Sequence, residues 1–197
     1  MPTKSWVSRL RPHKIPFRRR FVRASVALIL RQSEDGGKEL LFIQRATREG
    51  DPWSGDMAFP GGRLQPEDPS ARAAAERETL EETGIDLNRH GRYQARLSDL
   101  ITRHHSRWHP MVVTPYVFEW RGPKAVSPNH EVERAVWVPL NDLAARENQG
   151  QLPWRTRLGT LKLPCCRYQG ACIWGLSYSM LQELLAMATE KQCEPGT

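Results

Sequence analysis

Both ends of one helix are marked within residues 69–84, and this segment constrains the fold more than any other. Pro69 or Ser70 suits the first turn of a helix, and the alanines that follow are strong helix formers. Gly84 supplies the C-terminal stop. Glu residues inside the helix stand three and four positions apart, which places their carboxylates on one face. They are Glu78, Glu81 and Glu82.

These three carboxylates repel one another, and the repulsion disfavours the helix unless a cation lies among them. Carboxylate oxygens in a partly rigid array suit Mg²⁺ or Mn²⁺, and Mg²⁺ completes its coordination shell with water and substrate phosphate. An isolated E-x-x-E-E stretch is usually only a solvated helix face. The metal hypothesis therefore depends on three neighbours: the Gly61-Gly62 turn, the preceding Arg77, which could hold a carboxylate by an ion pair, and Gly84.

Short strands and a few helices are expected in the rest of the chain. Aliphatic and β-branched residues predict a buried strand at 22–30, paired as a hairpin with 40–45 across a turn at 33–37. Further strands are predicted at 57–59, 97–102, 111–120 and 132–138, and helices at 141–147 and 173–188. Residues 149–170 are interpreted as a Pro/Gly-punctuated connection. No regular βαβ alternation is present, so we predict an α+β fold, an α/β/α sandwich with a mixed β-sheet between helices.

The net charge of +7 is unevenly distributed along the chain. The first 33 residues hold nine Lys or Arg and no acid, whereas the remaining 164 hold 20 basic and 22 acidic residues and net −2. We therefore predict a basic, loosely structured arm at 1–20, one domain at 21–190 and a tail at 191–197. The near-neutral domain argues against nucleic acid as a partner. A solvated arm is favoured over one that contacts nucleic acid or acidic lipid, or that acts as an organellar presequence.

Cysteine usage and hydropathy bear on the compartment. The longest strictly apolar run is 26–30, far short of the roughly 20 residues of a membrane helix, so no membrane partner is expected. The four cysteines, Cys165, Cys166, Cys172 and Cys193, form no C-x-x-C pair, which favours a reducing, cytoplasmic compartment. The first three are interpreted as small apolar fillers near a strand.

The segment around the acidic helix resembles the Nudix box, G-x5-E-x7-R-E-U-x-E-E-x-G-U with U aliphatic. The matching residues are Gly62, Arg77, Glu78, Glu81, Glu82, Gly84 and Ile85. Three departures are an acidic Asp68 in place of Glu, eight residues rather than seven between it and Arg77, and Thr79 in place of an aliphatic residue. The chain is thus identified as a member of the Nudix hydrolase family, and the resemblance covers about residues 23–188.

The first two departures resemble the coenzyme A pyrophosphatase branch of this family, which reads F-P-G-G-x5-D-x8-R-E. Phe59-Pro60-Gly61-Gly62 fits that pattern, and the strand ending in Arg45 resembles the corresponding strand of the branch. Segments 113–117, 129–132, 137–140 and 173–176 resemble later parts of it. The basic R/H-x-G segment that the branch places before F-P-G-G is replaced by 51–57, in which only Gly55 survives.

The resemblance implies an enzyme that hydrolyses the pyrophosphate of a nucleoside diphosphate derivative with Mg²⁺ or Mn²⁺. It implies metal ligands at Glu78, Glu81 and Glu82, an orienting Arg77, and substrate contacts at Arg45, Phe59, Gly61 and Gly62. Glu131 and Glu133 are candidate general bases, although both could be simple rim residues of a strand. Dimers are common in the family, which favours a homodimer.

Several alternatives stay open at this point. Coenzyme A or a derivative competes with ADP-ribose, NADH, dinucleoside polyphosphates and capped RNA as the substrate, and a non-catalytic nucleotide- or RNA-binding module is the alternative to an enzyme. His105 and His109 could bind zinc if they lay on a helix, but the flanking strands favour a loop that faces the substrate. Arg103 and Arg107 could meet substrate phosphates, although solvated loop charges are the default interpretation. Trp53 and Phe59 could stack on a base or anchor the core.

Overall fold

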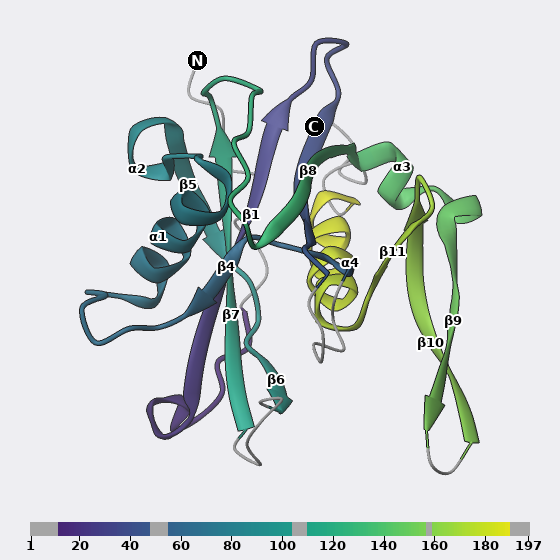
Figure 1. The fold of residues 1–197 in the computed structure, drawn as a ribbon, viewed down its shortest axis with the longest axis horizontal. Coiled ribbons are helices and arrows are strands. Elements are labelled where there is room, and N and C mark those ends of the chain that lie inside the picture. The colour runs from purple at the N-terminus through teal and green to yellow at the C-terminus, as the bar shows by residue number, and fades with distance from the viewer. Residues whose placement is uncertain (1–11, 48–54, 104–109, 157–158, 190–197) are drawn as a thin grey trace, which may run out of the picture.

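The computed structural model describes residues 12–47, 55–103, 110–156 and 159–189 (Figure 1). The strands are β1 (Val22–Gln32), β2 (Lys38–Arg45), β3 (Met57–Ala58), β4 (Gly61–Arg63), β5 (Gly91–Arg96), β6 (Leu100–Arg103), β7 (Pro110–Trp120), β8 (Val132–Pro139), β9 (Gln149–Thr156), β10 (Gly159–Tyr168) and β11 (Ala171–Trp174). The α-helices are α1 (Ala71–Thr83), α2 (Leu87–His90), α3 (Leu140–Ala144) and α4 (Gly175–Thr189), and short 3₁₀ turns lie at η1 (Arg18–Arg20) and η2 (Arg146–Asn148). Within these residues, no helix is both long and apolar enough to cross a membrane.

A mixed sheet forms the centre of the molecule, as predicted. The strand order β3-β2-β1-β7-β5 defines its main path, while β4, β6 and β8 pair with β1, β7 and β2 respectively. β1 runs parallel to β7 along its length, with Ala24 opposite Val113 and Ile29 opposite Phe118. β1 pairs with β2 and β4 antiparallel. Because β1 has neighbours on both sides and packs on both faces, it is a continuous apolar run rather than an alternating one.

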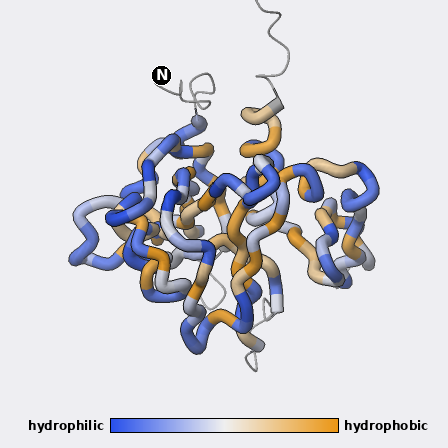
Figure 2. The backbone as a smooth tube through the Cα atoms, turned by 90° about the horizontal axis from the view of Figure 1, so that it is seen from above, coloured by the Kyte–Doolittle hydropathy of each residue, from blue (hydrophilic) through white to orange (hydrophobic). Residues whose placement is uncertain are grey.

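Helices cover the two faces of this sheet and give three layers (Figure 1). Ala27 and Ile29 of β1 belong to a core cluster on one face with Ala75 of α1 and Leu87 of α2. The alternate residues of β1 belong to a second cluster on the other face, which includes Leu181 and Leu184 of α4. Figure 2 shows apolar stretches running through the interior of the molecule. The predicted α/β/α arrangement is therefore confirmed.

The boundaries of α1 agree with the sequence signals. The Ser70 hydroxyl accepts a hydrogen bond of 3.1 Å from the Ala73 N–H and so caps the first turn. Gly84 ends the helix with φ of 71°, a conformation that favours glycine, and its N–H donates to the Leu80 carbonyl. Both ends of the acidic helix are therefore fixed by local chemistry.

The segment 149–170 differs from the prediction. Instead of an irregular connection, it forms the long antiparallel hairpin β9–β10, which continues into β11 as a separate three-stranded sheet. The two prolines that suggested irregular structure are both paired, Pro153 opposite Lys162 and Pro164 opposite Gln151. Figure 1 shows this hairpin beside α4, at the edge of the molecule away from α1.

The described part of the N-terminal arm is held against the domain through Asp99. The Asp99 carboxylate, whose side chain is fully buried, accepts a hydrogen bond of 3.0 Å from the Ile15 N–H and forms an ion pair of 3.4 Å with Arg18. The Asp99 N–H donates to the His13 carbonyl at 2.9 Å. Residues 12–20 are thus more ordered than the loosely structured arm that the sequence suggested.

Candidate active site

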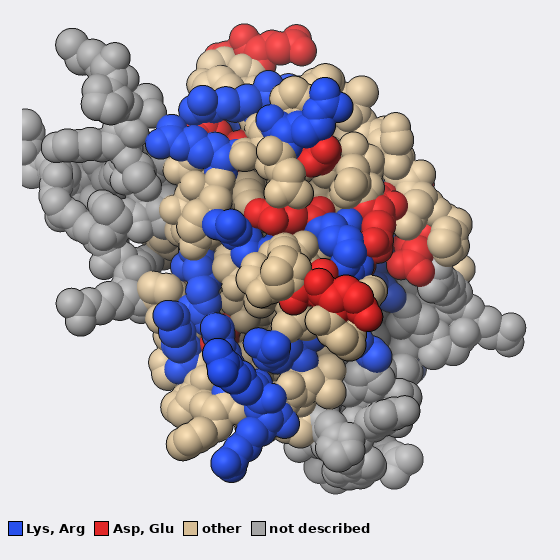
Figure 3. All heavy atoms as spheres, turned by 90° about the vertical axis from the view of Figure 1, so that its left-hand side faces the viewer, with Lys and Arg blue, Asp and Glu red and all other residues tan. Residues whose placement is uncertain are grey.

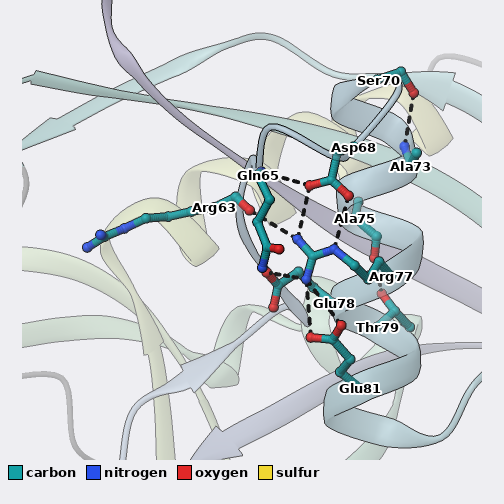
Figure 4. Close-up of polar contacts among 10 residues, drawn as sticks. All are labelled: Arg63, Gln65, Asp68, Ser70, Ala73, Ala75, Arg77, Glu78, Thr79 and Glu81. Carbon is teal, nitrogen blue, oxygen red and sulfur yellow. Dashed lines mark hydrogen bonds and ion pairs between the residues drawn. The ribbon is translucent and has the colours of Figure 1, made fainter.

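Arg77 is the centre of a polar network on α1 (Figure 4). Its guanidinium donates two hydrogen bonds of 3.0 Å to the Asp68 carboxylate, one from Nε and one from an Nη. The same guanidinium donates to the Arg63 carbonyl at 3.2 Å and to Glu81 at 3.1 Å, and it forms an ion pair of 2.9 Å with Glu78. Arg77 therefore ties the loop before the helix to two acidic residues on it.

The network accounts for two of the three departures from the Nudix pattern, the Asp at position 68 and the additional residue before Arg77. Asp68 folds back on its own loop, because its carboxylate accepts from the Gln65 N–H at 2.8 Å and its N–H donates to the Gln65 carbonyl. This compact turn brings the shorter Asp side chain to Arg77 across the additional residue. The Arg77 hydrogen bonds hold the pKa of Asp68 below its usual value.

Thr79, the third departure, occupies a fully buried position that the pattern gives to an aliphatic residue. Its hydroxyl donates to the Ala75 carbonyl one turn back at 2.7 Å, so no polar group is left unsatisfied. Thr83 repeats the arrangement with the Thr79 carbonyl at 2.6 Å. The small buried side chains let α1 lie close to the sheet.

Glu82 projects from α1 toward the Gly61-Gly62 turn and is buried, with 6% of its surface exposed. Its carboxylate accepts a hydrogen bond of 2.8 Å from the Gly61 N–H. Gly61 has φ of 148°, and a Cβ there would lie 2.3 Å from the Ser25 carbonyl oxygen. Only glycine fits this close approach of β4 to β1, so the turn presents its backbone N–H to Glu82.

Burial and like charge raise the pKa of Glu82 to about 7. The first cause is loss of water around the carboxylate, and the neighbouring carboxylates of Glu78 and Glu131 add to it. The Gly61 hydrogen bond and the positive charge of Arg45 act in the opposite direction. Burial also raises the pKa of Glu78, although Arg77 opposes this. The positive charges near Glu78 and Glu82 therefore do not offset the burial and mutual repulsion of these carboxylates.

Glu81 points differently from the other two glutamates. Its carboxylate is bound to Arg77, and its side chain is 53% exposed. Among the residues that the structure describes, no three His, Cys, Asp or Glu side chains gather closely enough to hold a metal ion as they stand. The expected convergence of three helix carboxylates is therefore not seen in this part of the chain, because Glu78 and Glu81 both pair with Arg77 whereas Glu82 is bound to the Gly61 N–H.

The donor set nevertheless fits a divalent cation. Glu78 and Glu82 are partly or largely buried carboxylates whose pKa values are raised, and hard oxygen atoms are what Mg²⁺ and Mn²⁺ prefer. A Cβ on Gly62 would lie 2.4 Å from the Glu78 carboxylate carbon, so glycine leaves the room that this carboxylate occupies. A cation at this position would supply the missing positive charge.

Glu131 comes from the loop between β7 and β8, which packs on the end of α1. The Ser127 and Asn129 N–H groups donate to the Thr83 and Glu82 carbonyls at 2.9 and 3.1 Å, so the loop satisfies the last carbonyls of the helix. The Asn129 side chain accepts from the Glu131 N–H at 2.8 Å. Sequence reasoning missed this role of Asn129, which the Pro128-Asn129 turn signal could have indicated. Glu133 is exposed on β8.

Arg45 and Phe59 have different surroundings. Arg45 ends β2, lines a cavity next to β3 and exerts its charge on Glu82. Phe59 is 4% exposed and packs on Phe42 with ring centroids 4.6 Å apart. Its ring is thus part of the core, which is one of the two alternatives that the sequence left open. Trp53, Arg107 and the histidines at 104, 105 and 109 lie outside the described residues, and so does the Arg103 side chain.

Both signs of charge lie on the α1 side of the molecule, the left-hand side of Figure 1. Figure 3 shows that Lys and Arg cover much of this face and that Asp and Glu gather in groups between them. The positive charge is thus not confined to the arm, even though the domain is nearly neutral in sum.

Comparison with known proteins gives a family match and one curated relative. The NUDIX domain model matches residues 21–158. An uncharacterized protein of Schizosaccharomyces pombe is 35% identical over 148 residues, which is 66% of this chain and 45% of that protein. The chain therefore spans about half the length of this relative.

Solved structures with a similar fold have low sequence identity. A Caenorhabditis elegans Ap4A hydrolase in a binary complex has a TM-score of 0.58 and 19% identity, covering 86% of this chain and 98% of its own. The Nudix hydrolase RenU of Mycobacterium smegmatis has a TM-score of 0.58 and 14% identity over 88% and 89% of the two chains. The NUDIX domain of Shewanella oneidensis NrtR, complexed with ADP ribose, has a TM-score of 0.53 and 16% identity over 98% and 99%. These likenesses show a shared fold.

Proposed function

Because the chain belongs to the NUDIX domain family, we propose that it is a pyrophosphohydrolase and that it cleaves the pyrophosphate bond of coenzyme A or a close derivative. Nudix hydrolases generally use divalent metal ions and act on nucleotide derivatives. In the proposed reaction, the oxygen of water bonds to one phosphorus and the bridging P–O bond breaks. Coenzyme A would give 3′,5′-ADP and 4′-phosphopantetheine, and two protons are released to solvent at neutral pH.

The observation that carries this proposal is the pair of carboxylates at the Gly61-Gly62 turn. Glu82 and Glu78 lie there with raised pKa values, and phosphate would be repelled by them unless a cation intervened. We propose Glu78 and Glu82 as metal ligands, with Glu81 as a third ligand once it leaves Arg77. A bound Mg²⁺ or Mn²⁺ would polarise phosphoryl oxygens and lower the pKa of a bound water.

The other residues of the site have supporting roles. Arg77 is a positioning residue, because it holds the Asp68 loop and the acidic helix in one geometry. Arg45 places a positive charge near Glu82, where it can attract a substrate phosphate. Glu131 is held at the edge of the carboxylate pair by the Asn129 turn and is proposed to take the proton from the attacking water.

Coenzyme A is favoured by the Phe59-Pro60-Gly61-Gly62 sequence and by the Asp68 spacing, both features of the coenzyme A branch. Two of the solved structures with a similar fold suggest other substrates for comparison. The Ap4A hydrolase suggests a dinucleoside tetraphosphate, and the NrtR domain suggests ADP-ribose. A non-catalytic nucleotide-binding module is disfavoured, since it has no need of carboxylates that repel phosphate. A cytoplasmic location and a homodimer stay predictions.

The test is a substrate panel with purified protein in Mg²⁺ or Mn²⁺, with products identified by mass. It contains coenzyme A, ADP-ribose, NADH, a dinucleoside tetraphosphate and capped RNA. We expect cleavage of coenzyme A, and a loss of turnover of roughly 10² or more in Glu82→Gln. Glu76→Gln is the matched control, because Glu76 lies on the same helix and pairs with Arg72 instead. A fully active Glu82→Gln variant would contradict the assignment of this residue.

A further inference from the structure

Most of the large apolar side chains that are exposed in the described part of the chain gather at one end of the molecule. Phe17 is 75% exposed, Ile101 59% and Leu161 55%, and Val22 and Trp154 are exposed to a lesser extent. They belong to the arm, to β6, to the hairpin β9–β10 and to the start of β1. Figure 1 shows the arm, the start of β1, β6 and the closed end of the hairpin in its lower part.

Strand pairing and a shared cavity connect these segments. Met111 at the start of β7 pairs with Val22 of β1 on one side and with Thr102 of β6 on the other. The cavity next to β3 is lined by Thr102 and Met111 and also by Leu163 of β10, so the hairpin adjoins the same end of the sheet. The arm reaches this end through its contacts with Asp99, which directly precedes β6.

The hairpin β9–β10 has an apolar face near its closed end. Trp154 lies opposite Leu161, and Leu152 lies opposite Leu163. Because side chains alternate between the two faces of a strand, these four lie on the same face. The Trp154 ring packs on Trp174, with ring centroids 4.8 Å apart, so its position is fixed. The hairpin therefore presents a fixed indole beside an exposed leucine.

Phe17 is held in solvent by the arm. Its φ of 53° lies in the left-handed region, which is unfavourable for a residue with a Cβ. Its carbonyl accepts a hydrogen bond of 2.9 Å from the Arg20 N–H, and the Arg20 guanidinium lies 5.4 Å from the ring centroid. Ile15 before it and Arg18 after it are both bound to Asp99. The exposure of this ring is thus imposed by its neighbours in the chain.

The charge at this end is positive. The segments 12–33, 100–118 and 149–182 contain no Asp or Glu. Asp99, which adjoins the second segment, is fully buried and paired with Arg18. Several basic residues of these segments are exposed, namely Lys14, Arg19, Arg20, Arg155 and Lys162. A partner that fits this end must accept apolar side chains and carry negative charge.

We propose that this end of the molecule docks on the surface of an anionic lipid bilayer. Aromatic and aliphatic side chains enter the boundary between head groups and acyl chains, while lysines and arginines bind the anionic head groups. The expectation of no membrane partner rested on the length of the longest apolar run, which a surface contact does not require. We call this end the basic apolar face, and its residues are Phe17, Val22, Ile101, Trp154 and Leu161 with Lys14, Arg19, Arg20, Arg155 and Lys162.

Two other partners fit these observations less well. Nucleic acid would use the basic residues and Trp154, but the exposed aliphatic side chains of Ile101 and Leu161 cannot stack on bases. A second copy of the chain docked through the same face would bring like charges together, since a two-fold interface sets each patch against itself.

Co-sedimentation of the full chain with liposomes is the first test. The vesicles contain phosphatidylcholine alone or phosphatidylcholine with about 30 mol% phosphatidylserine, at low and at high salt. We expect binding to the anionic vesicles to be at least about tenfold tighter than to the neutral ones, and to weaken as salt rises. Equal binding to both kinds of vesicle, or binding to neither, overturns the proposal.

A matched pair of charge variants locates the contact. Arg155→Gln with Lys162→Gln removes two exposed charges from the basic apolar face. Arg89→Gln with Arg92→Gln removes two exposed charges beside the opposite end of β7, where Arg92 pairs with Glu119. The first pair should weaken binding to anionic vesicles by roughly 10-fold to 30-fold, as expected for two basic residues near the surface, and the second pair much less. Equal losses would mean that net charge alone attracts the protein, which contradicts a specific face.

Leu161→Ser and Leu80→Ser test the apolar part of the face. Both leucines are about half exposed, so neither substitution is expected to prevent folding, and Leu80 lies on α1 instead. Leu161→Ser should lower the affinity for anionic vesicles by roughly tenfold, because its side chain no longer gains from leaving water, and Leu80→Ser should leave it unchanged. If Leu161→Ser binds like the wild type, no apolar insertion occurs and the proposal is wrong.

Two further measurements would assign the face to another partner. A short RNA oligonucleotide that displaces the full chain from anionic vesicles, and binds it more tightly than they do, would replace the bilayer by nucleic acid. A dimer in analytical ultracentrifugation that Leu161→Ser dissociates, together with no vesicle binding, would replace the bilayer by a second copy. A monomer that binds anionic vesicles and is not displaced by RNA supports the proposal.

Discussion

Gly62 lies directly against the carboxylate of Glu78. A Cβ at position 62 would be 2.4 Å from the carboxylate carbon and 2.6 Å from one of its oxygens, closer than Cβ atoms approach other atoms in folded proteins. At Gly61, in contrast, a Cβ would meet backbone, at 2.3 Å from the Ser25 oxygen and 2.6 Å from the Val26 Cα. The two adjacent glycines thus have different tasks, since one admits a side chain of the site and the other lets two strands approach.

Gly62→Ala should therefore damage the site and spare the fold. The end of the Glu78 side chain can move away from the new methyl group at little cost, but the carboxylate then leaves its position beside Glu82. We expect a fall in kcat of roughly 10-fold to 10³-fold and a weaker dependence on Mg²⁺, with Tm nearly unchanged. Activity titrations with Mg²⁺ and thermal unfolding measure the two effects.

Gly61→Ala serves as the comparison, because its methyl group meets backbone that cannot move and the residue has a positive φ. It should lower the free energy of unfolding by several kcal/mol, or prevent folding. A Gly62→Ala enzyme with wild-type kinetics would show that the position of Glu78 does not matter for turnover.

The raised pKa of Glu82 makes metal-free stability depend on pH. Its pKa is about 7 in the folded protein and about 4.5 when exposed, so the folded state binds the proton more tightly between these values. Stability from this group is fully present below about pH 4.5 and is lost as pH rises through about 7. Relative to Glu82→Gln, the wild type in EDTA should lose on the order of 2 kcal/mol between pH 5 and pH 8.

Urea unfolding of both proteins across this pH range measures the difference, and the comparison removes the titration of groups common to both. If the free energy of unfolding of the wild type rises relative to that of Glu82→Gln as pH rises, the predicted pH dependence has the wrong sign. Adding Mg²⁺ at pH 8 should restore the lost stability in the wild type and have less effect on the variant, since a bound cation stabilises the ionised carboxylate.

Arg77→Lys tests whether the guanidinium positions the loop. Lysine keeps the charge but cannot make two parallel hydrogen bonds to Asp68 while also reaching Glu81 and the Arg63 carbonyl. We expect a fall in kcat of roughly 10-fold to 100-fold with KM nearly unchanged, because the lysine still neutralises the cluster. Arg72→Lys is the control, since Arg72 lies on the same helix and makes a surface pair with Glu76 and a cation–π contact with Tyr93, neither of which involves the carboxylate site. If Arg77→Lys and Arg72→Lys have equal kcat and KM values, Arg77 does not act as a positioning residue.

Local signals predicted the parts of the fold that depend on neighbours in sequence. The cap at Ser70, the stop at Gly84 and the hairpin between β1 and β2 each follow from a few adjacent residues. The hairpin β9–β10 could not be found this way. Pro153 suits its edge strand, but Pro164 lies on the middle strand β10, where a proline normally argues against a strand. Tertiary context overrides the local signal there.

The candidate site likewise contains some contacts that sequence spacing could indicate and others that it could not. The Arg77–Asp68 and Arg77–Glu81 contacts lie within one helix and the loop before it, so spacing could indicate them. Arg77 pairs with both Glu78 and Glu81, whereas Glu82 binds the Gly61 N–H, and spacing alone does not decide this division of partners. The cavity gathers residues from Arg45 to Ser179, and nothing local in the sequence brings Asp56 to Trp174.

Deletion of residues 1–20 should lower stability and leave turnover largely intact. It removes the Ile15 N–H and the Arg18 side chain from the buried Asp99, which keeps its hydrogen bond of 2.7 Å from Thr114 and its ion pair with Arg96. Burial tends to raise the pKa of Asp99, but its hydrogen bonds and Arg96 hold that pKa below the usual value, so these partners stabilise the ionised carboxylate.

We expect the deletion to lower the free energy of unfolding by about 1–3 kcal/mol. Arg18→Ala should reproduce part of the loss and Arg19→Ala, at an exposed neighbouring position, none of it. Steady-state kinetics well below Tm complete the test, and a deletion that abolishes hydrolysis without lowering Tm would mean that the arm helps to build the site.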